Sequence, residues 1–362
     1  MKLLDREKEI QQLIAILSHE PALVYFIYGP INSGKTVLIN EVLYKLPDNY
    51  CVFYINFRGV ETNKYEDFVR ALFMIRDESL WDKLKSKMPP VVAAIEYTEQ
   101  MLKKINSRIE LPSEMIKLFL RKDKEEGVDV FYYLENLMKK LREKRKIPVI
   151  AFDEIQMIKE VEKNGPILHD LFNFFIRMTK ETKLSHVFVI TSDCLFIEEI
   201  YGNARLEGRS DYYLVDDLDK ERAYKVYEEF GFENKNLIWD WIGGKIGDMV
   251  RLWAKKIKNM TEEEGLEAML KDEVNRLKIL IEEVRYGIRK INWKGVEILL
   301  EEKSLINVLE IFTKRDKVEN ITVDAPHRIF LVQENILFSN PVTGELKPQG
   351  RLIQKAIKEI IR

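Results

Sequence analysis

The chain has 362 residues, of which 46% are hydrophobic and 33% are charged, and its formal net charge at pH 7 is -2. This length is enough for two or three domains, the composition excludes a disordered chain, and the balanced charge gives no overall attraction to nucleic acid. The first residues lack the apolar core of a secretion signal, and no apolar run approaches the roughly 18 residues of a membrane span, so we expect a cytoplasmic protein that does not enter a membrane.

The first helix is predicted at residues 3–18, where apolar side chains recur at helical spacing among charged ones. The apolar run at residues 23–28 is interpreted as a buried strand. The eight residues that follow match the pattern GxxxxGK[ST] and precede a second helical pattern. A strand, a glycine-rich turn and a helix in this order indicate a phosphate-binding P-loop. Its residues are Gly29, Pro30, Ile31, Asn32, Ser33, Gly34, Lys35 and Thr36.

The residue types of this turn suit the binding of ATP and Mg²⁺. Gly29 and Gly34 allow backbone N–H groups to wrap the β-phosphate at a helix N-terminus. Lys35 is expected to reach the β- and γ-phosphate oxygens, and the Thr36 hydroxyl to bind Mg²⁺. Adenine is favoured over guanine because residues 63–66, Asn-Lys-Tyr-Glu, lack the aspartate of a guanine-reading NKxD motif.

A second strand is predicted at residues 50–57, and residues 60–130 are interpreted as a helical insertion without a clear strand. A helix at about 130–144 follows. The next apolar strand, residues 147–152, ends in Asp153 and Glu154. After a P-loop, such an acidic pair indicates a Walker B segment. Asp153 would then support Mg²⁺, and Glu154 would activate the water that attacks the γ-phosphate.

A helix at about 155–182 is predicted to lead to a fourth strand at residues 186–192. A polar residue at the end of the strand beside Walker B would face the γ-phosphate, so Thr191 or Ser192 is a candidate sensor, and we select Ser192 as a nucleotide-binding residue.

Two arginines, Arg205 and Arg209, lie in the loop before the last predicted strand, residues 212–215. An arginine at this place can reach a nucleotide in cis or on a neighbouring subunit. We select Arg209 as a catalytic residue, together with Lys35 and Glu154.

The remainder of the chain is predicted to be mainly helical, with a helical lid from 217 to 257 and a charged connector helix from 261 to about 289. Helical patterns at 295–302 and 305–314 then precede strand-like runs at 329–332 and 336–338, a turn at 340–344 and a closing helix at 351–361. Helices followed by a two-stranded ribbon predict a winged helix. Its mildly positive charge leaves DNA and protein open as partners, although the basic run at 139–146 would extend a DNA surface.

With these motifs in place, the chain resembles the archaeal ATPase family, a group of AAA+-like, STAND-type P-loop ATPases. The resemblance rests on the P-loop, on Phe152-Asp153-Glu154-Ile155-Gln156 and on the tail segment 331–344, and it extends over nearly the whole chain. It implies a RecA-like core with the Walker B strand next to the P-loop strand, a helical lid and a C-terminal winged helix.

The resemblance also implies roles for residues outside these motifs. Residues 5–9, Asp-Arg-Glu-Lys-Glu, are similar to the opening box of the family, whose helix lies near the adenine in relatives, and Gly208-Arg209 matches its Gly-Arg element. The lid turn, residues 243–245, matches in part, because Ile246 stands where relatives carry proline. Arg251 resembles the sensor arginine of origin-recognition initiators, one residue beyond the usual place.

The sequence therefore predicts an α/β P-loop NTPase with a RecA/AAA+-like parallel sheet. The expected divisions are an ATPase core at 1–215 with the insertion at about 60–130, a lid at 216–258, a connector at 259–290 and a winged-helix-like domain at 291–362. The expected function is a Mg²⁺-dependent ATPase that acts as a molecular switch. Alternatives are a non-hydrolysing ATP-binding signalling module and a P-loop small-molecule kinase, and the oligomeric state stays open.

Overall fold

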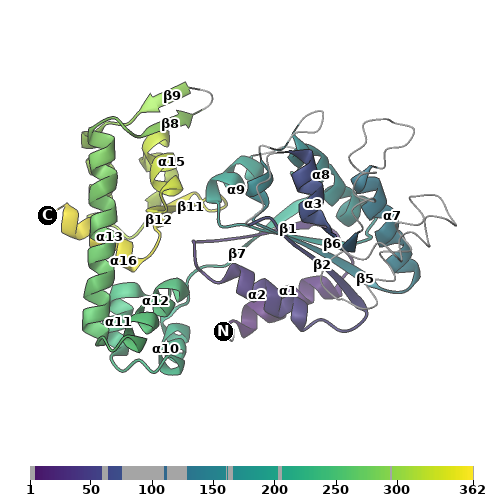
Figure 1. Cartoon of the computed structure of the whole chain (residues 1–362), viewed down its shortest axis with the longest axis horizontal. Helices are drawn as coiled ribbons and strands as arrows, with labels where there is room; N and C mark the ends of the chain where they lie inside the picture. Colours follow the sequence, from purple (N-terminus) through teal and green to yellow (C-terminus); the bar gives the residue numbers. More distant parts are fainter. Residues whose placement is uncertain are drawn as a thin grey trace.

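The structure, a computed structural model, describes residues 5–58, 64–75, 110–111, 129–159, 161, 166–202, 206–293 and 296–361. Figure 1 shows two parts side by side, a layered α/β core and a mostly helical part arranged along one long helix, α13 (Glu262–Arg285). Within the described ranges, no helix combines the length and the apolar character that a membrane crossing requires.

A five-stranded parallel sheet forms the core, in the order β2-β5-β6-β1-β7. This confirms the parallel sheet expected from alternating strands and helices. Because β6 lies between β1 and β5, the expectation that the Walker B strand lies next to the P-loop strand is wrong. Motifs identify what each strand carries, but strand order depends on crossover connections that the motifs do not specify. The strands are β1 (Val24–Tyr28), β2 (Tyr50–Asn56), β5 (Ile147–Asp153), β6 (His186–Ile190) and β7 (Ser210–Leu214).

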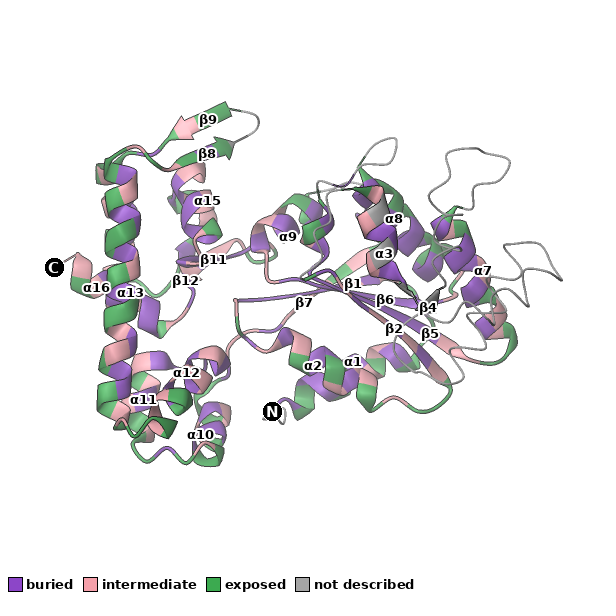
Figure 2. Cartoon of the chain, viewed as in Figure 1, coloured by how far each residue is buried: buried purple, intermediate pink, exposed green. Residues whose placement is uncertain are grey.

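Helices cover both faces of the sheet, because alternate side chains of each strand point to opposite faces. Ile27 and Ile190 pack on one face with buried residues of α1 (Glu7–Ser18) and α2 (Lys35–Tyr44). Phe26 and Val189 lie on the opposite face, and Figure 2 shows buried residues along the strands and the inner sides of these helices. The helices of that second face are α3 (Tyr65–Leu72), α7 (Val130–Glu143), α8 (Ile167–Ile176) and α9 (Cys194–Tyr201).

The predicted insertion at about 60–130 lies largely outside the described residues. In its described part, α3 is followed by β3 (Met74–Ile75), which pairs in parallel with β4 (Glu110–Leu111). The expectation of no strand is therefore wrong in this detail, because strands of two residues leave no apolar run to detect.

The single helix predicted at about 155–182 is also wrong in its extent. A 3-10 helix, Ile155–Ile158, follows β5 directly, and α8 begins only after Pro166. A proline is well suited to the start of a helix and poorly suited to its interior. Beyond α8 the backbone widens into a π-helical turn, Arg177–Glu181.

Three short helices occupy the range predicted to be a lid, and they share a hydrophobic cluster of their own. They are α10 (Lys220–Glu229), α11 (Lys235–Ile242) and α12 (Ile246–Ile257). The connector helix α13 follows, and Thr261 and Glu264 cap its first turn by exchanging side-chain-to-backbone hydrogen bonds.

The C-terminal region differs from the prediction at two places. The helix predicted at 295–302 is wrong for residues 296–299, which form β9 (Val296–Leu299) and pair with β8 (Lys290–Trp293) in an antiparallel hairpin. Residues 329–332 are not a strand but lie inside α15 (Ala325–Gln333). Asp324 caps this helix and Pro326 stands in its first turn, whereas four consecutive apolar residues alone suit a buried helix as well as a strand.

The predicted strand at 336–338 overlaps β11 (Leu337–Asn340), but its partner is β12 (Glu345–Pro348), which was not predicted, and a closing helix follows as expected. The ribbon is antiparallel, with β12 between β11 and a short edge strand. The elements are α14 (Glu302–Lys314), β10 (Val318–Glu319), β11 (Leu337–Asn340), β12 (Glu345–Pro348) and α16 (Arg351–Ile360).

Candidate functional site

The predicted P-loop connects the carboxyl end of β1 to the N-terminus of α2. Gly29 has a φ of 154°, and a Cβ atom at this position would lie 2.2 Å from the carbonyl oxygen of Val215. Gly34, with a φ of 91°, immediately precedes Lys35 and Thr36, which open α2. The turn therefore requires glycine at both positions, and it directs backbone N–H groups at a helix N-terminus, an arrangement suited to an anion.

The Lys35 side chain is buried and folds back on the turn. Its Nζ donates hydrogen bonds to the carbonyl oxygens of Gly29 at 3.1 Å and Pro30 at 2.8 Å. Burial, assisted by the nearby charge of Lys245, lowers the pKa of Lys35 to about 8. The positive charge is thus costly in this environment, which suits a site that receives an anion.

The carboxylate of Asp153 connects the sheet to the P-loop helix. Its Oδ2 accepts hydrogen bonds from Thr36 Oγ1 at 3.0 Å and Asn56 Nδ2 at 3.3 Å, and from the Tyr54 hydroxyl. Its Oδ1 is buried and has no hydrogen-bond partner among the described residues. Burial raises the pKa of Asp153. An orphaned carboxylate oxygen beside a threonine hydroxyl fits a hard divalent cation.

The described residues contain no group of three His, Cys, Asp or Glu side chains that could hold a metal ion. A Mg²⁺ ion at Thr36 and Asp153 would therefore depend on phosphate oxygens and water for its other ligands, which is how Mg²⁺ commonly binds with nucleotides. The residues present fit ATP with Mg²⁺.

Glu154 lies next to this carboxylate and is held by two side chains. It has a positive φ of 59°, and it forms an ion pair with Arg58. Its Oε2 accepts a hydrogen bond of 2.6 Å from Gln156, whose Oε1 accepts one of 2.8 Å from Thr191. The side chains of residues 154, 156 and 191 thus form one hydrogen-bonded chain.

Sequence reasoning gave no role to Tyr54, Asn56 or Arg58, although a signal was present. These polar residues lie at the end of β2 and just beyond it, and Asn56 pairs with Asp153 in the parallel register. The carboxyl ends of neighbouring parallel strands meet at one edge, so polar residues there gather at the same site. The missing information was that β2 and β5 are neighbours.

The sensor and arginine candidates lie in different places. Thr191 and Ser192 follow β6 at the same sheet edge as the P-loop, but it is Thr191 that connects to Gln156. Arg209 precedes β7, at the opposite end of the strands from the P-loop: its carbonyl accepts from Val24, the first residue of β1. The structure does not bring Arg209 to the P-loop within one chain, so action on a neighbouring subunit stays a prediction.

Arg251 does not point to the P-loop either, because it binds Asp248 at 3.2 Å and Glu273 of α13 at 2.9 Å. Another lid cation lies at the loop instead. Lys245, in the turn before α12, donates to the carbonyl oxygen of Ile31 at 3.1 Å. The sequence feature that could have identified Lys245 is its position directly after the two glycines of the lid turn.

The opening box also contacts the P-loop. Arg6 is buried and donates hydrogen bonds to the carbonyl oxygens of Ser33 at 2.9 Å and Asp216 at 2.7 Å. It also pairs with Glu9, which pairs in turn with Arg222 of the lid. Although burial opposes it, hydrogen bonds from both arginines lower the pKa of Glu9. This network fixes the chain's first helix against the loop and the lid.

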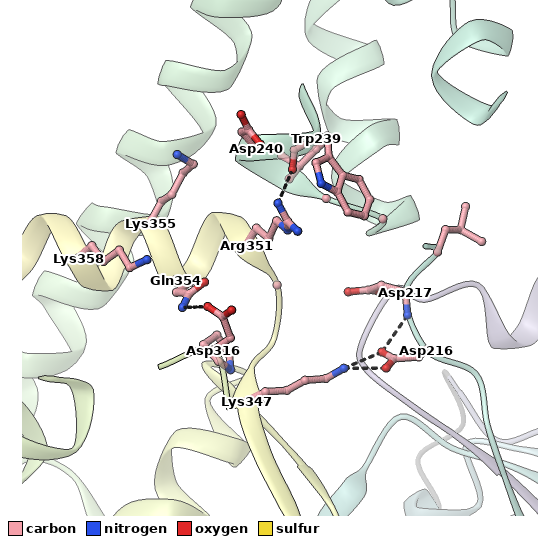
Figure 3. A pocket seen from close by; sticks show the side chains of 16 residues that line it. Asp216, Asp217, Trp239, Asp240, Asp316, Lys347, Arg351, Gln354, Lys355 and Lys358 are labelled. Atoms are coloured by element: carbon pink, nitrogen blue, oxygen red, sulfur yellow. Dashed lines mark hydrogen bonds and ion pairs between the residues drawn. The ribbon is translucent and has the colours of Figure 1, made fainter. Parts of the chain in front are cut away.

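A cavity of about 550 Å³ lies beside the site, between the lid and the C-terminal region (Figure 3). Lys347 of β12 pairs there with Asp216 at 2.7 Å. The guanidinium of Arg351 lies 4.4 Å from the ring centre of Trp239 on α11. The cavity therefore lies where side chains of β12 and α16 approach the lid.

The family comparisons cover both parts of the chain. A family model described as an ATPase domain predominantly from Archaea matches residues 3–252, and one described as the C-terminal domain of uncharacterized MJ1010-like ATP-binding proteins matches residues 263–361. The uncharacterized ATP-binding protein MJ0075 of Methanocaldococcus jannaschii is 39% identical over 372 residues, covering 100% of this chain and 99% of that protein.

A second relative, the uncharacterized ATP-binding protein PYRAB06260 of Pyrococcus abyssi, is 39% identical over 360 residues, covering 99% of this chain and 98% of that protein. Among solved structures, the Walker-type ATPase PABY2304 of Pyrococcus abyssi matches with a TM-score of 0.60 and 15% identity. That match covers 98% of this chain and 96% of the other, and it shows a shared fold.

Proposed function

Because the chain belongs to the family of ATPase domains found predominantly in Archaea, we propose that it binds and hydrolyses ATP and acts as a molecular switch. Its nucleotide state would be transmitted to the C-terminal region. The names of the relatives, which are ATP-binding proteins, support ATP as the ligand.

The observation that carries this proposal is the hydrogen bond between Thr36 and Asp153, together with the orphaned Oδ1 of Asp153. This hydrogen bond joins the start of α2 to the end of β5, and β5 is not adjacent to the P-loop strand β1 in the sheet. Bound Mg²⁺ would neutralise phosphate charge at this place. Lys35 would turn from the loop carbonyls towards the phosphates, and the amides at the start of α2 would hold them.

Glu154 is the residue proposed to orient water and take its proton. Gln156, which is hydrogen-bonded to Thr191, holds one oxygen of the carboxylate, and this contact would keep the carboxylate oriented towards the water during the reaction. Arg58 holds the other oxygen, but the Arg58 side chain is 71% exposed. An ion pair of this kind is weak, so Arg58 can be displaced when the site is loaded.

The contact between Arg58 and Glu154 also supports the second candidate, a module that retains ATP with very slow turnover. While both carboxylate oxygens are engaged, Glu154 is a poor acceptor for a water proton. A small-molecule kinase is less well supported, because a kinase does not need the adjacent acidic pair. Whether the C-terminal region, proposed to be a winged helix, meets DNA or protein is an outcome of the test below.

The test is steady-state ATP hydrolysis with Mg²⁺, with and without duplex DNA, together with calorimetry of ATP and GTP binding. We expect ATP to bind in preference to GTP, Glu154→Gln to retain ATP affinity and lose at least a hundredfold in turnover, and Lys35→Ala to lose binding. Unchanged nucleotide binding in Lys35→Ala would refute the assignment of the site. Slow turnover with tight retention of ATP would favour the second candidate, and stimulation by DNA would identify the partner.

A further inference from the structure

A glutamine of the C-terminal region enters the P-loop. Gln349 lies between β12 and α16 and is 4% exposed. Its Oε1 accepts a hydrogen bond of 3.2 Å from the backbone N–H of Ile31, the third residue of the P-loop. This contact joins residues 318 positions apart, and it is made to a backbone amide of the turn that is proposed to bind phosphate.

The orientation of the Gln349 carboxamide is fixed by its partners. Its Nε2 donates to the carbonyl oxygen of Leu337 at 3.2 Å, and its own backbone N–H donates to the carbonyl oxygen of Ile336 at 2.9 Å. A carbonyl can only accept and an amide N–H can only donate, so the carboxamide oxygen must face Ile31. The oxygen therefore occupies an acceptor position at the loop.

The ribbon that carries Gln349 is anchored at the same edge of the core. Asn340, at the end of β11, accepts a hydrogen bond of 2.8 Å from the Tyr28 hydroxyl at the end of β1, and both residues are buried. Lys347 of β12 pairs with Asp216. Figure 1 shows β11 extending from the C-terminal part towards the core. Gln349 is thus positioned by a packed element and not by a loose loop.

We infer that Gln349 is a nucleotide-site residue whose carboxamide oxygen competes with a phosphate oxygen for the backbone N–H of Ile31. One N–H serves one strong acceptor, so a nucleotide that uses this amide must displace Gln349. Conversely, the docked ribbon lowers the affinity for nucleotide, because coupling between two sites is reciprocal. The inference rests on the proposed function in taking a nucleoside triphosphate as the competing ligand.

The first test is calorimetry of ATP and ADP binding to Gln349→Ala in the full chain. Loss of one ordinary hydrogen bond corresponds to a change of roughly three- to tenfold in a binding constant, and we expect nucleotide to bind more tightly by this factor. Gln349→Glu retains an acceptor but adds a negative charge facing phosphate, so it should bind nucleotide more weakly. Unchanged or weaker binding by Gln349→Ala would overturn the inference.

Gln354→Ala is the matched control. Gln354 lies in α16, the helix that begins shortly after Gln349, and its amide donates to the carbonyl oxygen of Phe312 and to Asp316, both in the C-terminal region. This variant should leave nucleotide affinity unchanged. Tyr28→Phe is a second probe, because it removes the hydrogen bond to Asn340 and keeps the ring. It should shift affinity in the same direction as Gln349→Ala.

A second readout needs no nucleotide. In the nucleotide-free protein, amide hydrogen exchange at Ile31 should be faster in Gln349→Ala than in the wild type or in Gln354→Ala. Equal exchange in all three proteins would show that Gln349 does not protect this amide and would refute the inference. A wild type that binds no nucleotide would instead refute the proposed function, and the exchange result would still decide whether Gln349 holds the loop.

Discussion

At the residue scale, the site is built from charges placed where they are costly. Lys35 has its pKa lowered to about 8 by burial and by Lys245, and Asp153 has its pKa raised by burial. The like charge and the desolvation weaken the folded protein in the absence of ligand, and an anion with a divalent cation would relieve both. Such a trade of stability for function is common at binding sites.

Removal of the buried charge is therefore expected to stabilise the nucleotide-free protein. Lys35→Met should raise the free energy of unfolding by about 2 kcal/mol at pH 7, since a pKa lowered by burial measures the cost of keeping the amine charged. Between pH 8 and 10.5 the unfolded wild type still binds the proton that the folded protein has lost, so wild-type stability rises with pH. The advantage of the variant should shrink across this window.

Thermal unfolding of the nucleotide-free protein from pH 7 to pH 10 measures this difference. Lys45→Met is the control, because the Lys45 side chain is 46% exposed at the end of α2. A Lys35→Met variant that is less stable than the wild type at pH 7 would show that the hydrogen bonds of Lys35 outweigh its burial.

At the scale of elements, the sequence was informative where a pattern is local. The P-loop and the strand before Asp153 each lie within a few consecutive residues, and both were predicted. The order of strands was not, because it depends on which crossover passes over the sheet, and the expectation that β5 lies next to β1 was wrong for that reason. The prediction of a strand at 329–332 was wrong because a short run of apolar residues suits a buried helix as well as a strand.

The contacts between elements were beyond prediction for a related reason. Lys245 and Gln349 reach the P-loop from distant parts of the chain, and neither stands in a motif that names its partner. Polar residues at the end of β2 carried a signal that could be interpreted only once β5 was known to be its neighbour. The candidate site was thus predictable in its central residues and not in the side chains that hold them.

The turn before α12 illustrates how tightly the backbone is packed inside the lid. A Cβ atom added at Gly244 would lie 1.7 Å from the carbonyl oxygen of Leu218, and Leu218 donates a backbone hydrogen bond to Gly244. Backbone cannot move aside as a flexible side chain can. Gly244→Ala should therefore lower the free energy of unfolding by about 3 kcal/mol, and it should also weaken nucleotide binding by moving Lys245.

Chemical denaturation and calorimetry check the two effects. Gly202→Ala serves for comparison, because a Cβ atom there would meet its nearest neighbour at 3.7 Å, and it should change stability by less than about 0.5 kcal/mol. Equal stability of the two variants would mean that the backbone of the lid turn can shift at little cost in free energy.

At the scale of the whole molecule, the C-terminal region is joined to the core by more than the ribbon. Arg328 of α15 binds Glu198 of α9 through two hydrogen bonds, of 2.6 and 2.9 Å, and the Arg328 side chain is only 13% exposed. A paired, partly buried contact of this geometry is stronger than an ordinary surface ion pair. It fixes the distance between α15 and the core.

Arg328→Ala should weaken this docking by about 1–2 kcal/mol and increase the radius of gyration measured by small-angle scattering. Arg285→Ala is the matched control: Arg285 makes the same kind of paired contact with Glu302, but both residues belong to the C-terminal side of the molecule. If the two variants scatter alike, the contact between α15 and α9 does not hold the parts together.

The sequence separation between Ile31 and Gln349 has a consequence during synthesis. A ribosome makes the P-loop early, and the glutamine that meets it is translated more than three hundred codons later. The emerging core therefore passes through a period in which its loop amides have no competitor from the same chain. A nucleotide captured in that period would be bound before the C-terminal ribbon is synthesised, so newly made molecules would already contain nucleotide when folding is complete.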